Sequence, residues 1–202
     1  MFVQVIQGKT SDAAALKAAT DQWADELAPG AEGWLGTTAG VTADGTFLAV
    51  VRFESEQTAM RNSHRPEQDQ WWAEASSHLD GPAAFHDTED VVEDIVGDPD
   101  RAGFVQIMQG HGTDPDRARE LMTQDSGRWA EFRPDVLGSI AAQYDDGDYT
   151  MTMYFTNEAE ARVGEKKEPP PELQAQMAEM SALSVGETVF FDITDPWIYS
   201  PR

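Results

Sequence analysis

The 202-residue sequence contains no cysteine and no apolar run long enough to cross a membrane. Without cysteine, the chain cannot form disulfides, use a thiolate as a nucleophile or bind zinc through sulfur. A membrane-spanning helix needs roughly 18 apolar residues in a row, and no stretch approaches that length. The N-terminus also lacks the basic and apolar regions of a secretory signal. We therefore expect a soluble cytoplasmic protein.

Basic residues are scarce as well. Lys and Arg total 14 against 37 Asp and Glu, so the formal net charge is −23. Such a chain repels nucleic-acid phosphates and anionic lipid surfaces, which argues against both kinds of partner. The excess acid is typical of a strongly solvated surface, with salt adaptation or a cationic partner as alternatives. One acidic run comprises Asp87, Glu89, Asp90, Glu93 and Asp94. Its carboxylates alternate with Val and Ile, as on a strand with one solvent-exposed face, so we predict no metal site there.

The two halves of the sequence repeat each other. The segment FVQVIQG at residues 2–8 recurs as FVQIMQG at residues 104–110, a shift of 102 positions. Further pairs keep the same order: Asp44-Gly45 with Asp146-Gly147 at that shift, and Phe85-His86-Asp87 with Phe190-Phe191-Asp192 at a shift of 105. So many matches in one order indicate a duplication.

Each half is predicted to contain the elements β, α, β, β, α and β. Alternating apolar residues and turn signals indicate strands at 2–7, 34–41, 46–53 and 83–96, then near 104–109, 136–143, 149–155 and from 187 onwards. In the first half, an Ala-rich helix should start at an N-cap on Ser11 or Asp12 and end near Leu27. A second helical region should span 54–62 and resume at 67–79, after an interruption at His64-Arg65-Pro66.

A four-stranded antiparallel sheet with two helices on one face leaves its other face in need of a cover. We therefore predict an α+β fold in which tandem ferredoxin-like βαββαβ repeats form an intramolecular, pseudo-dimeric α+β barrel. The repeats are placed at 1–96 and 104–202, with a linker at 97–103. The tail 195–199 should pack across the other half. The chain would be a monomeric pseudo-dimer that could oligomerise further.

The third strand of each half has two different sides. One side is apolar and carries, in the first half, Phe47, Ala49, Val51 and Phe53. The other side mixes polar and apolar groups and includes Arg52 and Tyr154. Because ligand cavities combine apolar walls with a few polar groups, we assign this mixed side to a cavity between the sheets. Arg52 would pair with an acidic group of the protein or with an anionic ligand, and Gln4 would contribute if it shares that side.

These motifs resemble antibiotic-biosynthesis-monooxygenase-like domains of the dimeric α+β barrel superfamily. The resembling segments, spread over both halves, include in the first half FVQVIQG, the strand pair WLGTTAGVTADGTFLAVVRFES, and Glu56-Gln57-Thr58-Ala59 leading to Asn62-Ser63-His64-Arg65-Pro66-Glu67-Gln68 and Trp71-Trp72. The resemblance implies two ferredoxin-like units packed sheet to sheet. It also implies a small-molecule ligand, because the superfamily includes cofactor-independent monooxygenases of aromatic polyketides and haem-degrading enzymes.

The haem-degrading branch is similar to this chain only in fold. Its members pair an Asn on the first strand with a Trp and a His on the second helix. Here the first strand carries Gln4 and Gln7, and the spacing from Trp71 or Trp72 to His78 is too short for that pattern. We therefore expect no cofactor, with haem as the alternative.

The candidate chemistry is concentrated in the first half. It holds three of the four histidines, whereas the matching stretch GEKKEPPP at 164–171 has neither Trp nor His. This predicts an asymmetric ligand site, although drift of the second copy into a surface loop would leave the same pattern. His64 is the candidate base, since imidazole exchanges protons near neutral pH, and Arg65 would hold the resulting oxyanion. At a helix break, both residues could equally cap carbonyls or face water.

The sequence thus favours a cofactor-independent monooxygenase-like enzyme that acts on a small aromatic or polyketide-type molecule. The candidate ligand contacts are Asn62, Trp71, Trp72, Arg52, Tyr154 and Gln4, and the candidate catalytic residues are His64 and Arg65. Either Trp could instead belong to the core. Two other functions stay open: a barrel that binds a small molecule, haem included, without catalysis, and a structural or regulatory protein without a ligand.

Overall fold

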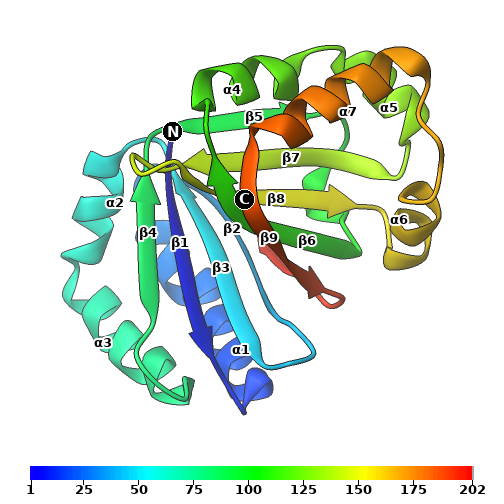
Figure 1. Cartoon of the computed structure of the whole chain (residues 1–202). Helices are drawn as coiled ribbons and strands as arrows, with labels where there is room; N and C mark the ends of the chain where they lie inside the picture. Colours follow the sequence, from blue (N-terminus) through cyan, green and yellow to red (C-terminus); the bar gives the residue numbers. More distant parts are fainter. Residues whose placement is uncertain (202) are drawn as a thin grey trace. The chain divides into compact units, whose positions relative to one another are not determined.

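The computed structural model describes residues 1–201, which form two compact units. The first unit holds residues 1–89 and the segment from Asp195 onwards, and the second holds residues 90–194. Each has a five-stranded antiparallel sheet with helices on one face (Figure 1). The predicted α+β class with tandem ferredoxin-like units is confirmed. Closure of the two sheets into a barrel concerns the arrangement of the units and stays a prediction. No helix in residues 1–201 combines the length and apolarity needed to cross a membrane.

The first unit has the strand order β10-β2-β3-β1-β4. Its elements are β1 (Phe2–Lys9), α1 (Ala13–Gln22), the π-helical turn η1 (Trp23–Leu27), the 3-10 turn η2 (Ala28–Gly30), β2 (Trp34–Val41), β3 (Thr46–Phe53), α2 (Glu56–Ser63), α3 (Pro66–Ala75), the 3-10 turn η3 (Ser76–His78), β4 (Ala84–Thr88) and β10 (Trp197–Tyr199).

Local sequence signals explain where the first-unit helices begin. The Asp12 carboxylate accepts the N–H of Ala15 at 3.0 Å, so Asp12 is the N-cap of α1. Ser55 and Thr58 form a capping box at the start of α2. Pro66 occupies the first turn of α3, where its missing N–H costs nothing. The predicted interruption between the second and third helices is therefore confirmed.

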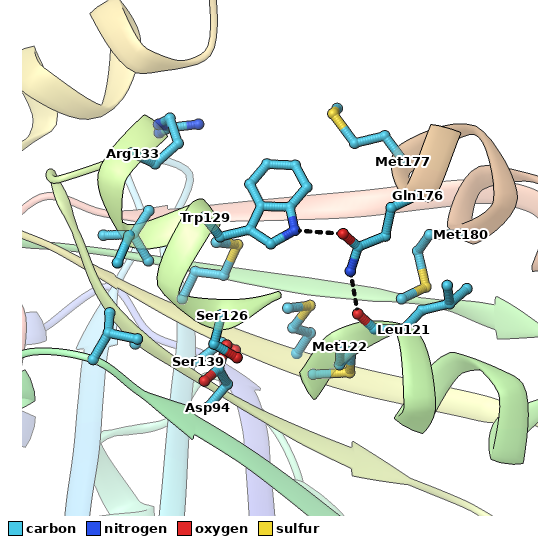
Figure 2. A pocket seen from close by; sticks show the side chains of 16 residues that line it. Asp94, Leu121, Met122, Ser126, Trp129, Arg133, Ser139, Gln176, Met177 and Met180 are labelled. Carbon is cyan, nitrogen blue, oxygen red and sulfur yellow. Dashed lines mark hydrogen bonds between the residues drawn. The ribbon is translucent and has the colours of Figure 1, made fainter. Parts of the chain in front are cut away.

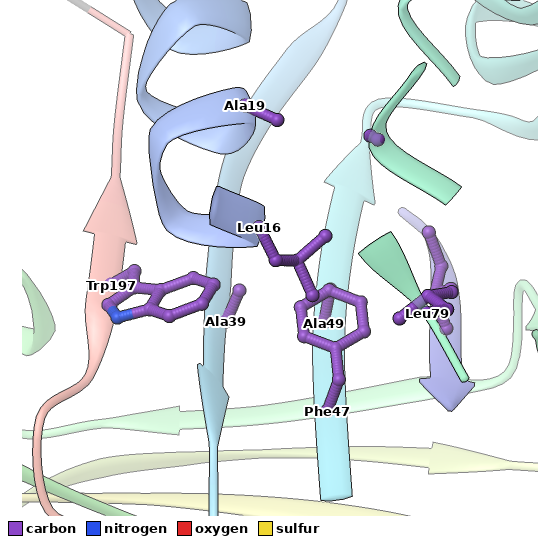
Figure 3. Packing of buried hydrophobic residues seen from close by; sticks show 9 residues of the cluster. Leu16, Ala19, Ala39, Phe47, Ala49, Leu79 and Trp197 are labelled. Atoms are coloured by element: carbon purple, nitrogen blue, oxygen red, sulfur yellow. The ribbon is translucent and has the colours of Figure 1, made fainter. Parts of the chain in front are cut away.

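The helices cover the side of the first sheet that was predicted to be apolar. Leu16 and Ala19 of α1 pack on Phe47 and Ala49 of β3, with Trp197 of β10 beside them (Figure 3). Leu16 is only 2% exposed. The period-2 alternation of β3 thus sets which side chains meet the helices.

The second unit repeats the plan with the strand order β5-β7-β8-β6-β9. Its elements are β5 (Val91–Ile95), the 3-10 turn η4 (Pro99–Arg101), β6 (Phe104–Gly112), α4 (Pro115–Thr123), α5 (Ser126–Phe132), β7 (Val136–Gln143), β8 (Asp148–Phe155), α6 (Glu158–Gly164), α7 (Pro171–Leu183) and β9 (Ser184–Ile193). Pro66 and Pro171 both lie in the first turn of their helices, 105 positions apart. The three extra residues of the second copy therefore lie between α6 and α7.

The fifth strand of each sheet follows the fourth strand of the other. The predicted single strand at 83–96 is wrong, because it is broken at Glu89-Asp90 into β4 of the first unit and β5 of the second. β5 pairs with β7 through Val92 and Ala141, and β10 pairs with β2 through Trp197 and Ala39. These two pairings occupy equivalent places in the repeats. The predicted addition of the tail to the other repeat is thus seen in the pairing of β10 with β2.

Candidate functional site

A cavity of about 270 Å³ lies between the first sheet and its helices. It is lined by side chains from β1, β2, β3, β4, α1, η1, α2 and α3: Phe2, Gln4, Ile6, Leu16, Thr20, Trp23, Thr37, Phe47, Ala49, Val51, Phe53, Glu56, Ala59, Met60, Asn62, Ser63, Gln68, Asp69, Trp71, Trp72, Ala75, Phe85 and Asp87. This first-unit cavity therefore lies on the apolar side of β3, below the helices.

One wall of the first-unit cavity is a run of aromatic rings. The ring centroids of Trp23 and Trp71 are 6.2 Å apart, those of Trp71 and Trp72 are 6.0 Å apart, and those of Trp72 and Phe85 are 5.4 Å apart. The indole N–H of Trp71 donates to the carbonyl of Ala19 at 2.7 Å, which holds α3 against α1. Such a wall offers flat apolar faces on which a planar ligand can stack.

A chain of four polar side chains forms a hydrogen-bonding corner, which meets the aromatic wall at Trp23. Trp23 Nε1 donates to Gln68 Oε1 at 2.7 Å, and Asn62 Nδ2 donates to the same oxygen at 3.3 Å. Arg65 Nη1 in turn donates to Asn62 Oδ1 at 2.9 Å. Indole and guanidinium groups can only donate, so they determine which end of each amide is oxygen. Both amides therefore have a defined orientation.

This orientation leaves N–H donors beside the cavity. Gln68 Nε2 donates to no group within residues 1–201, and Asn62 Nδ2 uses one of its two hydrogens on Gln68. The indole N–H of Trp72, another lining residue, also has no acceptor in that part of the chain. The corner can thus donate hydrogen bonds to a carbonyl or phenolate oxygen.

Four predicted contacts meet in this cavity, and the two predicted catalytic residues do not line it. Gln4, Asn62, Trp71 and Trp72 all belong to the lining. His64 is exposed at the C-terminal end of α2, where its backbone N–H bonds the carbonyl of Met60 at 3.1 Å.

Arg65 acts as a structural tie beside the cavity. Its guanidinium donates to Asn62, to the carbonyl of Leu27 at 3.1 Å and to Glu67 at 3.0 Å. The backbone N–H of Glu67 and the Arg65 guanidinium hold the pKa of the Glu67 carboxyl below its usual range. Arg65 therefore orients Asn62.

Arg52 and Tyr154 lie on the sheet face turned away from the helices. They therefore do not line the cavities that lie between each sheet and its own helices. In the register of β1 and β3, Arg52 pairs with Val3, whereas Gln4 pairs with Val51 of the cavity side. The two residues thus lie on the side that was predicted to be mixed, away from the helices, and the cavity predicted between the two sheets concerns the arrangement of the units and stays a prediction. The Arg52 guanidinium instead lies over Gly36, whose φ of 143° and contact with that group leave no room for a side chain.

The acidic groups of the lining lie on β4, α2 and α3. Asp87 Oδ1 accepts from Gln4 Nε2 at 3.0 Å, and Glu56 and Asp69 are the other two carboxylates. No histidine belongs to the lining, so it supplies no imidazole ligand for a haem iron. Within residues 1–201, no cluster of three or more His, Asp or Glu side chains could hold a metal ion.

The second unit has two adjoining chambers between its own sheet and helices. The first, of about 220 Å³, includes Trp129 of α5 and Gln176 of α7, and we call it the Trp129 chamber (Figure 2). The second, of about 460 Å³, includes Tyr149 of β8, and we call it the Tyr149 chamber. Gln176 accepts from Trp129 Nε1 at 2.8 Å and donates to the carbonyl of Leu121.

Sequence reasoning missed Gln68, Trp23 and the entire second-unit cavity. Gln68 ends one of the family-like segments but was not chosen as a ligand contact, and only its two donors reveal its role. A compositional signal did exist for the second unit. Six of the eight methionines follow residue 104 and line the two chambers: Met108, Met122, Met151, Met153, Met177 and Met180.

Comparison with solved structures finds the same fold over the whole chain. A candidate monooxygenase from Lactobacillus acidophilus superposes with a TM-score of 0.76 at 10% identity, covering 98% of this chain and 96% of that one. A candidate monooxygenase from Fusobacterium nucleatum gives 0.72 at 8% identity, with 98% and 94% covered. An anthrone oxidase-like protein gives 0.64 at 11% identity, with 98% and 92% covered.

At such low identity these likenesses concern the fold alone. No protein-family model matches the sequence, and neither does any curated protein. A ferredoxin-fold protein related to antibiotic biosynthesis monooxygenases, from Listeria monocytogenes, aligns over 100% of this chain with a TM-score of 0.50. The resemblance seen in the sequence is thereby confirmed in fold: the chain has the tandem ferredoxin-like fold of antibiotic-biosynthesis-monooxygenase-like proteins.

Proposed function

We propose that the protein is a cofactor-independent monooxygenase-like enzyme whose first-unit cavity binds a small, flat aromatic molecule of the polyketide type. The observation that carries this proposal is the pairing of an indole wall with oriented amide donors. The wall suits a planar ring system, and the donors suit a ring oxygen. The anthrone oxidase-like neighbour supports an anthrone as the first substrate to test.

The amide donors of Asn62 and Gln68 would act by stabilising the ionised substrate. An anthrone has a ring CH2 opposite a carbonyl, and loss of one CH2 proton gives a phenolate-type anion. N–H donors already oriented towards its oxygen favour that anion without further rearrangement. The anion then supplies electrons to dioxygen. One oxygen atom becomes the new carbonyl and the other leaves as water, so CH2 plus O2 gives C=O plus H2O.

The proton would leave through a carboxylate of the lining or directly to solvent. Asp87 is the best placed carboxylate, because its bond from Gln4 orients it on β4 beside the aromatic wall. His64 lies outside the lining, so a His64→Ala variant should keep its oxygen uptake. Loss of uptake in that variant would restore His64 as the base.

The decisive variant is Gln68→Glu. Its carboxylate still accepts from Trp23 and Asn62, so the network stays satisfied, but it removes two N–H donors and adds a negative charge. A hydrogen bond to a charged group contributes about 1.5–3 kcal/mol, so we expect anthrone-dependent oxygen uptake to fall by about tenfold or more. Oxygen-electrode measurements in aerobic buffer give the rate.

Gln70→Glu is the matched control, since it makes the same change on the same helix at an exposed position outside the lining. It should retain the wild-type rate. If the two variants oxidise anthrone equally fast, the amide donors take no part in the reaction.

A non-catalytic binding protein is the second candidate. It is favoured by the exposure of the carboxylates in the described lining, because water reaches them and competes for the contact that a base would make with a substrate proton. In that case anthrone would quench the fluorescence of the Trp wall and the Gln68→Glu change would weaken this quenching. No oxygen would be consumed.

A further inference from the structure

The second unit carries methionine at six positions where the first-unit cavity is lined by other residues. Each methionine that lines its chambers stands at the repeat position of a residue that lines the first-unit cavity. In order, Met108, Met122, Met151, Met153, Met177 and Met180 replace Ile6, Thr20, Ala49, Val51, Trp72 and Ala75. The hydrogen-bonding groups have changed as well, because Gly164 and Leu173 stand where the first unit has Asn62 and Gln68. The six methionine changes fall on the lining of the two chambers.

One tie between the helices that cover the sheet recurs in both units. In the first, Trp71 donates to the carbonyl of Ala19, and in the second, Gln176 donates to the carbonyl of Leu121 at the equivalent position. The helix above the sheet is therefore tied down alike in both. What differs is the chemistry of the cavity.

Four methionines separate the Trp129 chamber from the Tyr149 chamber. The residues common to both linings are Met122, Met151, Met177 and Met180, and no other residue is shared. Methionine is unbranched and has three rotatable side-chain bonds, so it adapts to a ligand at little cost. Figure 2 shows Met177 and Met180 on α7 facing the chamber that holds Trp129. Rotation of these side chains would join the chambers into one elongated cavity.

The charges around the two chambers disfavour an anion. Arg133 is the only cationic lining residue, and the carboxylate of Asp135 binds its Nη2 at 2.7 Å and its Nε at 3.0 Å. Both partners are largely buried, with side-chain exposures of 15% and 6%. The other charged lining groups are the carboxylates of Asp94, Asp114 and Asp148. An anionic head group would thus meet the lining carboxylates, and the described lining residues include no cation that is not already bound by a carboxylate of the protein.

We propose that the second unit is a separate binding site for a neutral, flexible and mainly aliphatic ligand, such as a long-chain alcohol. The side chains of the four shared methionines rotate, so that the alkyl chain of the ligand extends from one chamber into the other. This site is independent of the reaction proposed for the first unit.

Methionine-methyl NMR tests this proposal directly. In full-length protein labelled with 13C at the methionine methyls, Met60 reports on the first-unit cavity and the six chamber methionines report on the second. Met→Leu variants, which nearly conserve volume, assign the signals. 1-Dodecanol should shift the signals of Met122, Met151, Met177 and Met180 saturably and leave Met60 in place. Dodecanoate should bind at least about tenfold more weakly, because its carboxylate would be desolvated without a partner.

A pair of variants locates the dodecanol site. Met177 is 49% exposed and lines both chambers, so Met177→Glu should fold normally and weaken dodecanol binding about tenfold through lost apolar contact. Val163→Glu adds the same charge at a 62% exposed position outside both chambers and should change nothing. The remaining methionine signals show whether each variant is folded. The proposal fails if dodecanol shifts the Met60 signal as much as the signals of Met122, Met151, Met177 and Met180. It also fails if dodecanoate binds as tightly as dodecanol, or if Met177→Glu leaves the affinity for dodecanol unchanged.

Discussion

At the scale of single residues, Asn62 shows what a sequence motif leaves undetermined. The sequence singled out Asn62 as a ligand contact through its motif, and it does line the first-unit cavity. Its neighbours Arg65 and Gln68 determine what it can offer, because one occupies its oxygen and the other one of its hydrogens. No sequence pattern specifies such a hydrogen-bond direction.

Removing the Asn62 amide should cost stability. Asn62 is only 7% exposed, so Asn62→Ala leaves partly buried donors of Arg65 and an acceptor of Gln68 with fewer partners. We expect the free energy of unfolding to fall by about 1–2 kcal/mol. Urea denaturation measures it. Ser63→Ala, an exposed neighbour whose hydroxyl bonds only the carbonyl of Met60, should change it little. Equal stability of the two variants would show that the network contributes nothing to folding.

At the scale of elements, strand β10 is held to the first unit by more than its pairing with β2. The Tyr199 hydroxyl donates to Asp21 of α1 at 2.7 Å. Burial, together with this bond, raises the pKa of Tyr199 above its usual value. Burial alone would raise the pKa of Asp21, but bonds from Lys17 and Tyr199 hold it below its ordinary value. The contact joins the last strand to the first helix.

The Tyr199 contact should make stability depend on pH in the alkaline range. A hydroxyl whose pKa is raised by folding contributes its full stabilisation below its pKa in the unfolded state, which is about 10. This stabilisation is lost as the pH rises towards and through its pKa in the folded state. Wild type should therefore exceed Tyr199→Phe by about 1 kcal/mol near neutral pH. The difference should shrink above about pH 10, as followed by urea unfolding across pH. If the unfolding free energies of wild type and Tyr199→Phe keep the same difference above about pH 10, the Tyr199 hydroxyl is not the source of the pH dependence.

The exchange of β5 and β10 was only half visible in the sequence. The tail was predicted to reach the other repeat, whereas 83–96 was predicted to be one strand. Period-2 alternation continues through Glu89-Asp90, so it cannot reveal that the chain leaves one sheet there and enters another. Only the partners of β4 and β5 show the break.

At the scale of the whole molecule, charge is the dominant feature. With a net charge of −23, acidic groups repel one another across the folded surface. Going from about 0.01 M to about 1 M salt shortens the screening length from about 30 Å to about 3 Å. The melting temperature should therefore rise with NaCl, and KCl should give the same rise. Calorimetry measures it. A flat response would mean that the repulsion is already compensated locally.

The sequence by itself determined the duplication, the antiparallel strands, the helix starts and the acidic surface, because each follows from local spacing, capping or composition. Tertiary structure decided that a cavity lies between the first sheet and its helices, where Trp71 and Asn62 meet, whereas the place of Arg52 on the other face had been predicted from alternation. It also brought six methionines together from four elements. The physical reason is that alternation distinguishes the two sides of a strand, whereas only the packing of side chains from several elements determines where a cavity is left.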